Sequence, residues 1–266
     1  MNFMCCRVTV LCLLTIMATF ITLYGMEMNW DRRSEICTQR ALLQRVIYGG
    51  DLDTISQLLR YVELDDPIDS FGRTPLHYAV ECGQTDIVCL LLDHGAHAHS
   101  QAASGDTPFH AASRLGDVEV VKALLARGAY AWFAGACGKT PLHVAAESGT
   151  SAVVKELLYN GADVTARDAG GMRPLHLAMR HEFGDTKVGE ILLTLGGTGQ
   201  LSLENDSGDL PLDVALYCRR WNCVDFLLWN GAPSNTDLRA LTCELGEEDQ
   251  IVRLLRSYGR VRGDLS

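Results

Sequence analysis

The sequence contains no C-x-x-C pair, although it has ten cysteines among its 266 residues. Three cysteines lie in the N-terminal apolar region, and the other seven are scattered through the rest of the chain, most of them inside predicted helices. An odd number of dispersed cysteines does not suit a disulfide framework or a zinc ribbon. This usage is typical of a reducing compartment.

The chain also has little positive charge. Lysine and arginine number 23 against 33 acidic residues, which gives a net charge of −10 and a pI near 5.2. Proteins that bind the phosphate backbone of nucleic acids depend on clustered lysine and arginine. We therefore expect no nucleic-acid partner.

Sequence motifs of common catalytic sites are missing. There is no G-x-S-x-G, no H-E-x-x-H, no G-x-x-x-x-G-K-[ST], and no H-x-E followed by P-C-x-x-C. We predict that the protein is not an enzyme and that it uses neither a cofactor nor a metal ion.

One string, by contrast, recurs along the chain: GRTPLHYA, GDTPFHAA, GKTPLHVA, GMRPLHLA and GDLPLDVA. The first four copies begin at glycines spaced 33 residues apart, and the fifth begins 37 residues later at Gly208. An active site occurs once in a fold, whereas a residue repeated at a fixed period belongs to a repeated structural unit. The histidines of the string are therefore predicted to be architectural.

Each copy predicts two helices. Thr74 can cap the first helix and Pro75 suits its first turn, while Gly83 ends it. A second helix then carries apolar residues at Ile87, Val88, Leu91 and Leu92, a stripe that recurs in later copies and must be buried. One such pair cannot bury its apolar face alone, so neighbouring pairs must stack into a solenoid.

The chain resembles the ankyrin-repeat family, whose signature is a 33-residue T-P-L-H-x-A unit of a turn and two antiparallel helices. The resemblance covers roughly residues 36–259 and implies an all-α repeat solenoid of about seven units, including degenerate caps at both ends. We predict an N-terminal segment at 1–34, a repeat domain at 35–259, a tail at 260–266, and repeats at about 36–68, 69–101, 102–134, 135–167, 168–204, 205–236 and 237–259.

Two repeats depart from the pattern. The fifth is four residues longer, which fits about two extra residues between its helices and about two in the following turn. The sixth has Leu210 in place of the threonine and Asp213 in place of the histidine. The family resemblance implies that threonine and histidine form a hydrogen-bonded brace, and it assigns this structural role to Thr74, His77, Thr107, His110, Thr140, His143 and His176.

Two other groups of residues could carry chemistry. His94, His97 and His99 include a His-x-His pattern that can chelate a metal, but they fall in a turn, and we favour a solvated turn. Cys218 and Cys223 flank two arginines that could lower a thiol pKa, but Cys223 lies in the buried stripe and is interpreted as a core residue.

The resemblance implies that a protein partner binds the concave face, which the turn tips and the ends of the first helices line. The candidate partner-binding residues are Phe71, Arg73, Glu81, Asp106, Arg114, Leu115, Lys139, Glu147, Met172, Arg180 and Tyr217. Trp132 and Phe133 are further candidates, either as exposed binding anchors or as rings packed on Tyr130 and the neighbouring turn. The sequence does not name the partner.

The N-terminal segment has an uncharged run from Val8 to Met26, which is long enough to span a bilayer as a hydrophobic helix. Small residues do not stand at the spacing of a cleavage site, so we favour a membrane anchor over a cleaved signal peptide. Arginines after the run favour repeats that face the cytosol. Asn205 begins an N-D-S acceptor for glycosylation, which would apply if the repeats were luminal.

Three functions fit these observations. The favoured one is a non-enzymatic interaction scaffold or adaptor, held at a membrane, that binds a protein partner on its concave face. The alternatives are a secreted or host-directed effector after signal cleavage, and a soluble inhibitor or adaptor of a signalling or transcription protein.

Overall fold

A computed structural model describes residues 32–59, 62–180, 186–236 and 249–258. The apolar run from Val8 to Met26 lies outside these ranges, and so does the predicted tail at 260–266. The chain divides into two compact units, residues 1–40 and 41–266, and the repeats belong to the second.

Within the described ranges, the chain forms thirteen α-helices and two 3-10 helices, with no strand. The first helices of successive repeats are α4 (Pro75–Glu81), α6 (Pro108–Leu115), α8 (Pro141–Glu147), α10 (Pro174–Ala178) and α12 (Pro211–Tyr217). The second helices are α5 (Thr85–Asp93), α7 (Val118–Ala126), α9 (Ser151–Tyr159), α11 (Lys187–Gly196) and α13 (Trp221–Trp229). The predicted all-α repeat solenoid is confirmed.

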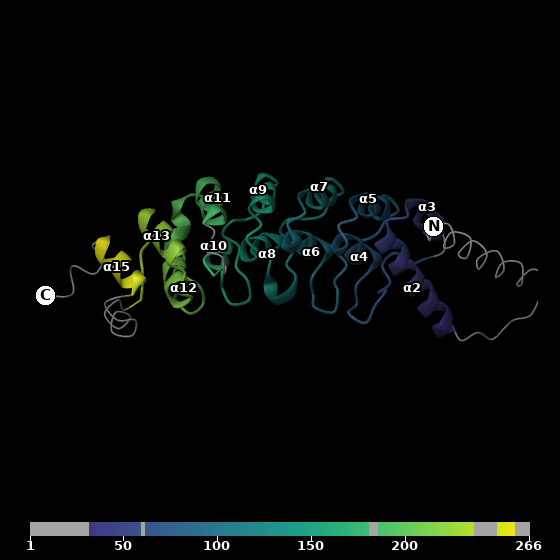
Figure 1. The fold of residues 1–266 in the computed structure, drawn as a ribbon, viewed down its shortest axis with the longest axis horizontal. Coiled ribbons are helices and arrows are strands. Elements are labelled where there is room, and N and C mark those ends of the chain that lie inside the picture. The colour runs from purple at the N-terminus through teal and green to yellow at the C-terminus, as the bar shows by residue number, and fades with distance from the viewer. Residues whose placement is uncertain (1–31, 60–61, 181–185, 237–248, 259–266) are drawn as a thin grey trace, which may run out of the picture. The chain divides into compact units, whose positions relative to one another are not determined.

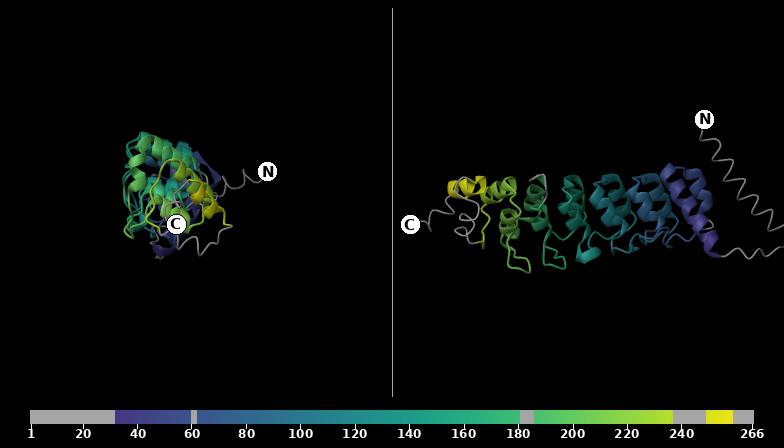
Figure 2. Two further views of the ribbon diagram at one scale, coloured as in Figure 1. Left: turned by 90° about the vertical axis from the view of Figure 1, so that its left-hand side faces the viewer. Right: turned by 60° about the horizontal axis from the view of Figure 1, so that its bottom comes forward.

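Within the second compact unit, the first helices form one row and the second helices form another. Figure 1 shows α5, α7, α9 and α11 along one side, the first helices beside them, and the turn tips beyond the first helices on the opposite side. The other views agree with this order (Figure 2). Degenerate ends complete the second unit. The part of α2 (Arg32–Gly49) from residue 41 onward and α3 (Leu52–Leu58) precede α4, and α15 (Gln250–Ser257) follows α13.

The start of each first helix follows from its sequence. Thr74 is extended at the N-cap, and Pro75 stands at the first helical position, where no intrahelical N–H bond is lost. Gly83 follows the helix with φ +67°, a left-handed conformation that a side chain disfavours. The chain can therefore turn sharply into the second helix.

The apolar stripe of the second helices is buried at most of its predicted positions, but its fourth position is only half-buried in three repeats, at Leu92, Leu125 and Leu158. Ile87, Val88 and Leu91 are at most 1% exposed, and they belong to one hydrophobic cluster that reaches from Leu43 to Leu255. First helices pack on the first helices of the next repeat, and most second helices do the same. Each repeat is therefore stabilised mainly by its neighbours.

The longer fifth repeat keeps its core, but the buried positions of its second helix come later in the repeat. The buried Val188 lies two positions further from its tip glycine, Gly171, than Ile87 lies from Gly72. One 3-10 helix, η1 (Ala136–Gly138), lies in an earlier turn, and the other, η2 (Thr198–Ser202), lies in the turn that follows α11. The buried Gln200 side chain holds η2 by donating its Nε2 hydrogens to the carbonyls of Leu192 (2.8 Å) and Gly197 (3.1 Å).

No helix in the described ranges is both long enough and apolar enough to cross a bilayer.

Candidate functional site

The histidine of the repeated string joins two neighbouring repeats. In α4 the His77 Nδ1 accepts the backbone N–H of Thr74 (3.2 Å) and lies 2.9 Å from the Thr74 hydroxyl. The opposite nitrogen, Nε2, lies 3.1 Å from the carbonyl oxygen of Asp106 in the next repeat. Since Nδ1 accepts a hydrogen bond, the proton of the neutral ring is on Nε2, which donates to that carbonyl.

The same arrangement recurs down the stack. The Nε2 atoms of His110, His143 and His176 lie 2.9, 3.1 and 3.2 Å from the carbonyls of Lys139, Met172 and Asp209. Thr107 and Thr140 place their hydroxyls 2.7 and 2.9 Å from the adjacent Nδ1 atoms. This geometry fits the brace that the sequence predicts.

Burial keeps these four rings neutral. Burial lowers the pKa of His77, His110 and His143 below the ordinary 6.5, and the bond that each donates to a carbonyl only partly opposes this. Burial lowers the pKa of His176 to about 4, and the nearby Arg173 guanidinium adds to this effect. The hydrogen bond to the Asp209 carbonyl opposes it only in part. A protonated Nδ1 could no longer accept the N–H, so protonation would break the brace.

The sixth repeat replaces the imidazole with a carboxylate. Asp213 is 1% exposed and accepts the Leu210 N–H (2.9 Å), which is the capping bond of the histidine in other repeats. The next turn supplies donors in place of a carbonyl, because the Ser234 hydroxyl (2.5 Å) and the Thr236 N–H (2.9 Å) both donate to Asp213. Burial alone would raise the pKa of Asp213, but these hydrogen bonds outweigh it and lower the pKa.

Arg173 takes the threonine position in the fifth repeat. Its backbone N–H donates to His176 Nδ1 (3.2 Å), and its guanidinium donates to the carbonyl of Glu204 (2.6 Å). The brace therefore persists in the fifth repeat without a hydroxyl.

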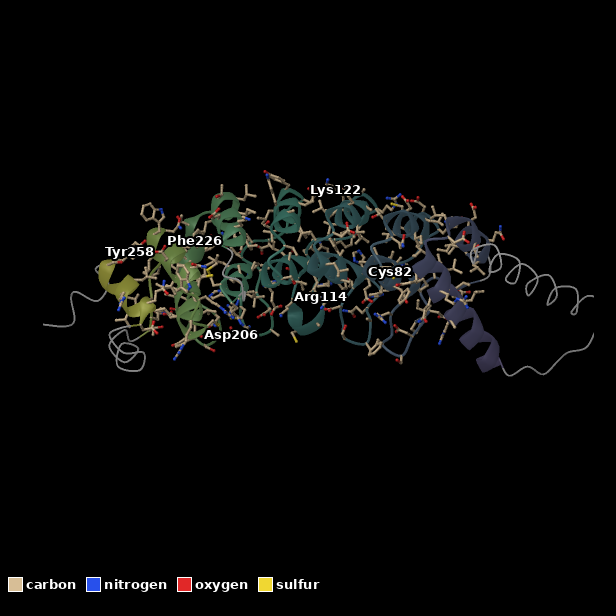
Figure 3. All side chains as sticks on the ribbon, in the orientation of Figure 1. Cys82, Arg114, Lys122, Asp206, Phe226 and Tyr258 are labelled. Carbon is tan, nitrogen blue, oxygen red and sulfur yellow. The ribbon has the colours of Figure 1, made fainter. Side chains whose placement is uncertain are left out.

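A second set of residues faces away from the core. We call this surface the ladder face. In each repeat it contains the side chain that follows the tip glycine and a side chain at or just after the end of the first helix, eight residues later. The five pairs are Arg73 and Glu81, Asp106 and Arg114, Lys139 and Glu147, Met172 and Arg180, and Asp209 and Tyr217. Phe71, just before the first tip glycine, and Leu115, beside the second pair, are counted with the ladder face. Figure 3 shows Arg114 on the row of first helices and Lys122 on the row of second helices.

The first three pairs of the ladder face are ion pairs. Arg73 pairs with Glu81, Arg114 Nη2 lies 3.0 Å from Asp106 Oδ2, and Lys139 Nζ lies 2.5 Å from Glu147 Oε2. The sign reverses from one repeat to the next, since the tips read positive, negative, positive and the helix ends read the opposite. This part of the face therefore has both charges and little net charge.

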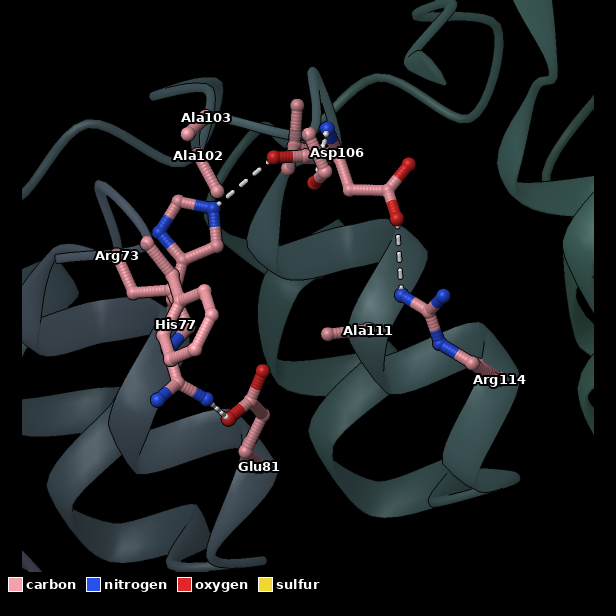
Figure 4. A pocket seen from close by; sticks show the side chains of 11 residues that line it. Arg73, His77, Glu81, Ala102, Ala103, Asp106, Ala111 and Arg114 are labelled. Carbon is pink, nitrogen blue, oxygen red and sulfur yellow. Dashed lines mark hydrogen bonds and ion pairs between the residues drawn. The ribbon is translucent and has the colours of Figure 1, made fainter. Parts of the chain in front are cut away.

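A hollow of about 290 Å³ opens between the first two of these pairs. Phe71 and Arg73 form one wall, Asp106 and Arg114 form the other, and the small side chains of Ala102, Ala103 and Ala111 also line it. Figure 4 shows the Arg73–Glu81 and Asp106–Arg114 pairs on opposite sides of the hollow, with His77 reaching across to Asp106.

Arg73 is fixed on its wall of the hollow by several contacts. Its Nε lies 2.5 Å from Asp69 Oδ2, and its guanidinium carbon lies 5.2 Å from the Phe71 ring centroid and 5.7 Å from that of Tyr78. At these distances the guanidinium group attracts the faces of the aromatic rings, so the contacts hold Arg73 and Phe71 in place before a partner binds. Phe71 nevertheless keeps 66% of its surface in solvent.

The last two pairs of the ladder face differ from the first three. Met172 is uncharged and half-buried, and Arg180, its counterpart, is exposed and forms no ion pair within the described ranges. Tyr217 is 60% exposed, and Asp209 accepts a hydrogen bond from the Asn205 side chain (3.2 Å). The paired and the unpaired parts of the face thus lie in different repeats.

Trp132 and Phe133 belong to a stack of four rings. The His99 ring lies 4.7 Å from Tyr130 and 5.1 Å from Phe133, and Tyr130 lies 5.0 Å from Trp132. Trp132 packs on Tyr130 and still keeps 63% of its surface exposed, so it has features of both interpretations that the sequence left open. His99 and Trp132 occupy equivalent positions of successive repeats, and each of them stacks on Tyr130.

The remaining candidates have ordinary surroundings. His97 lies 3.5 Å from Asp65, and no group of three metal-ligating side chains occurs in the part of the chain that the structure describes. Cys223 is buried and Cys218 is half-buried. Asn205 is half-buried in a turn, where its side-chain oxygen accepts the N–H groups of Ser207 and Asp209, both at 2.9 Å. Its glycosylation stays a prediction.

Comparison with known proteins identifies the repeats. A family model for ankyrin repeats in three copies matches residues 14–102 and 96–168, and a model for ankyrin repeats in many copies matches residues 142–195. A mouse protein, 2-5A-dependent ribonuclease, is 43% identical over 58 residues, which make up 21% of this chain and 8% of that protein. So small a share carries no inference about ribonuclease activity.

Proposed function

Because this chain belongs to the ankyrin-repeat family, whose members generally serve as protein–protein interaction modules, we propose that it is a non-enzymatic adaptor that binds a protein partner on its ladder face. The observation that carries the proposal is the hollow between Arg73 and Arg114, with large apolar side chains exposed along the same face. Fold alone does not specify a partner, so the site must carry the argument.

Three exposed apolar side chains lie on or beside the ladder face. Phe71, Leu115 and Tyr217 are 66%, 55% and 60% exposed, and each stands beside charged groups. Interfaces combine apolar and aromatic anchors with a polar rim. Removing an ion pair from water costs free energy that the attraction between its charges need not repay, so the first three pairs suit the solvated rim. The apolar side chains suit the contacts that supply affinity.

Replacing Leu115 with glutamate should weaken partner binding at least tenfold, because a carboxylate beside the Asp106–Arg114 pair adds a charge that the partner must desolvate. The change should leave thermal unfolding nearly unchanged, since Leu115 is 55% exposed. The measurement is quantitative co-precipitation from cell extract with the full chain as bait.

The matched control is Trp229→Glu, which alters a 79% exposed side chain at the end of a second helix. This control should retain partner binding. Equal loss of the same partners in both variants, or no loss in Leu115→Glu, would contradict binding on the ladder face.

We further propose that the apolar run from Val8 to Met26 attaches the protein to a membrane with its repeats in the cytosol. Protease treatment of intact microsomes that carry the full chain with a C-terminal epitope should destroy the epitope while the N-terminal part stays with the membrane. A protected epitope would favour a secreted or luminal effector, and an epitope in the soluble fraction would favour the soluble adaptor.

A further inference from the structure

Arg219 adopts a backbone conformation that glycine adopts elsewhere in the stack. Its φ is +54°, and it occupies the position between the two helices where earlier repeats have Gly83, Gly116 and Gly149, with φ between +67° and +77°. A side chain with a Cβ is strained in this left-handed region. An exposed arginine at this position therefore costs stability that glycine would not.

The surroundings of Arg219 show no internal use for its charge. The Arg219 side chain is exposed and forms no hydrogen bond or ion pair within the described ranges. Six basic side chains of the repeats pair with an acid: Arg73, Arg114, Lys122, Arg127, Lys139 and Arg167. Lys155 and Arg173 have other contacts, a tyrosine ring and a backbone carbonyl, whereas the Arg180 and Arg219 side chains have no such contact within the described ranges.

These two arginines belong to neighbouring repeats. Helix α10 packs on α12, and Arg180 follows α10 in the position that Tyr217 occupies at the end of α12. Tyr217 and Trp221, on either side of Arg219 in sequence, are 60% and 46% exposed. This edge of the ladder face therefore combines two cations that lack acidic partners in the described ranges with exposed aromatic side chains, in a chain with a net charge of −10.

We propose that Arg180, Tyr217, Arg219 and Trp221 form a docking site for an acidic segment of a protein partner. The carboxylates of the segment pair with the two guanidinium groups, and an apolar side chain of the segment packs on the aromatic rings. The inference rests on the proposed function and adds to it the chemistry of the partner and the repeats that bind it.

The test uses a phage library of random twelve-residue peptides, selected on the immobilised full chain. Enriched peptides should be rich in aspartate and glutamate, and their affinity, measured by fluorescence anisotropy, should fall as salt is raised. Arg219→Gly should weaken their binding at least tenfold and raise the melting temperature by about 2–4 °C, because glycine relieves the left-handed strain. A purely structural role for Arg219 would not move stability and binding in opposite directions.

Cys137→Gly is the matched control, since Cys137 also has a φ of +54° and is exposed. It should gain stability and retain peptide binding. Neutral or basic enriched peptides, or acidic peptides that bind Arg219→Gly normally, would overturn the inference. If the peptides that overturn the inference fail to bind Leu115→Glu, the proposed function stands and only the inference fails. If no enriched peptide depends on Leu115 or on Arg219, both fail.

Discussion

Replacing His143 with leucine should lower the free energy of unfolding by about 3 kcal/mol, because the change leaves the buried N–H and hydroxyl of Thr140 without a partner and removes one of the two donors to the Met172 carbonyl. Leucine fills much of the ring volume, but it can neither accept the Thr140 N–H (3.1 Å) nor donate to the Met172 carbonyl (3.1 Å). His143 is completely buried and lies in the middle of the stack, so the change also weakens the contact between its own repeat and the next. Urea unfolding followed by circular dichroism measures the loss.

His97→Leu is the control for this prediction. The His97 side chain is 78% exposed and lies beside an exposed acid, so its replacement should change the free energy of unfolding by less than about 0.5 kcal/mol. Equal stability of His143→Leu and the wild type would show that the histidine does not brace the repeats.

The second large effect is a loss of stability in mild acid. Unfolded histidines titrate near pKa 6.5, whereas burial lowers the pKa of all four braced histidines below that value. Unfolding therefore takes up protons in this range, and stability that is complete above pH 6.5 falls as the pH drops. The shift of His176 from 6.5 to about 4 alone corresponds to about 3 kcal/mol at pH 4.

The measurement is the free energy of unfolding from urea titrations between pH 7.5 and pH 4.5. His176→Gln should reduce the number of protons taken up on unfolding by about one, because it removes one titrating ring. Asp213 should contribute almost nothing to the change of stability with pH in this range. Its pKa is lowered, so its hydrogen bonds are lost only in stronger acid. A stability that is flat over this pH range would contradict the neutral, hydrogen-bonded state of the four rings.

The sequence predicted the repeating architecture because the relevant signals are local and periodic. The 33-residue spacing indicated that the histidines are structural, and the apolar stripe predicted most of the buried positions of the second helices, although Leu92 and its equivalents Leu125 and Leu158 are only half-buried. The N-cap position of Thr74 and the short first helix follow from residues within one turn of each other, although the Thr74 hydroxyl contacts His77 Nδ1 and not a helix N–H. The boundaries of the individual repeats stay predictions.

The contacts between repeats were harder to predict, since they join residues far apart in sequence. Asp213 was recognised as a departure, but its partners at Ser234 and Thr236 are more than 20 residues away and lie in a turn without a sequence signature. The internal pairing of the ladder face was also missed, although opposite charges eight residues apart in three successive repeats were its signal.

Site-specific photo-crosslinking tests most directly whether the partner binds the ladder face. A photoreactive phenylalanine analogue is placed either at Tyr217, on the ladder face, or at Trp229, at the end of a second helix, and both side chains are at least 60% exposed. We expect the full chain to crosslink to its captured partner from position 217 and not from position 229. Crosslinks from position 229 alone would show that the partner binds the row of second helices and would contradict the account.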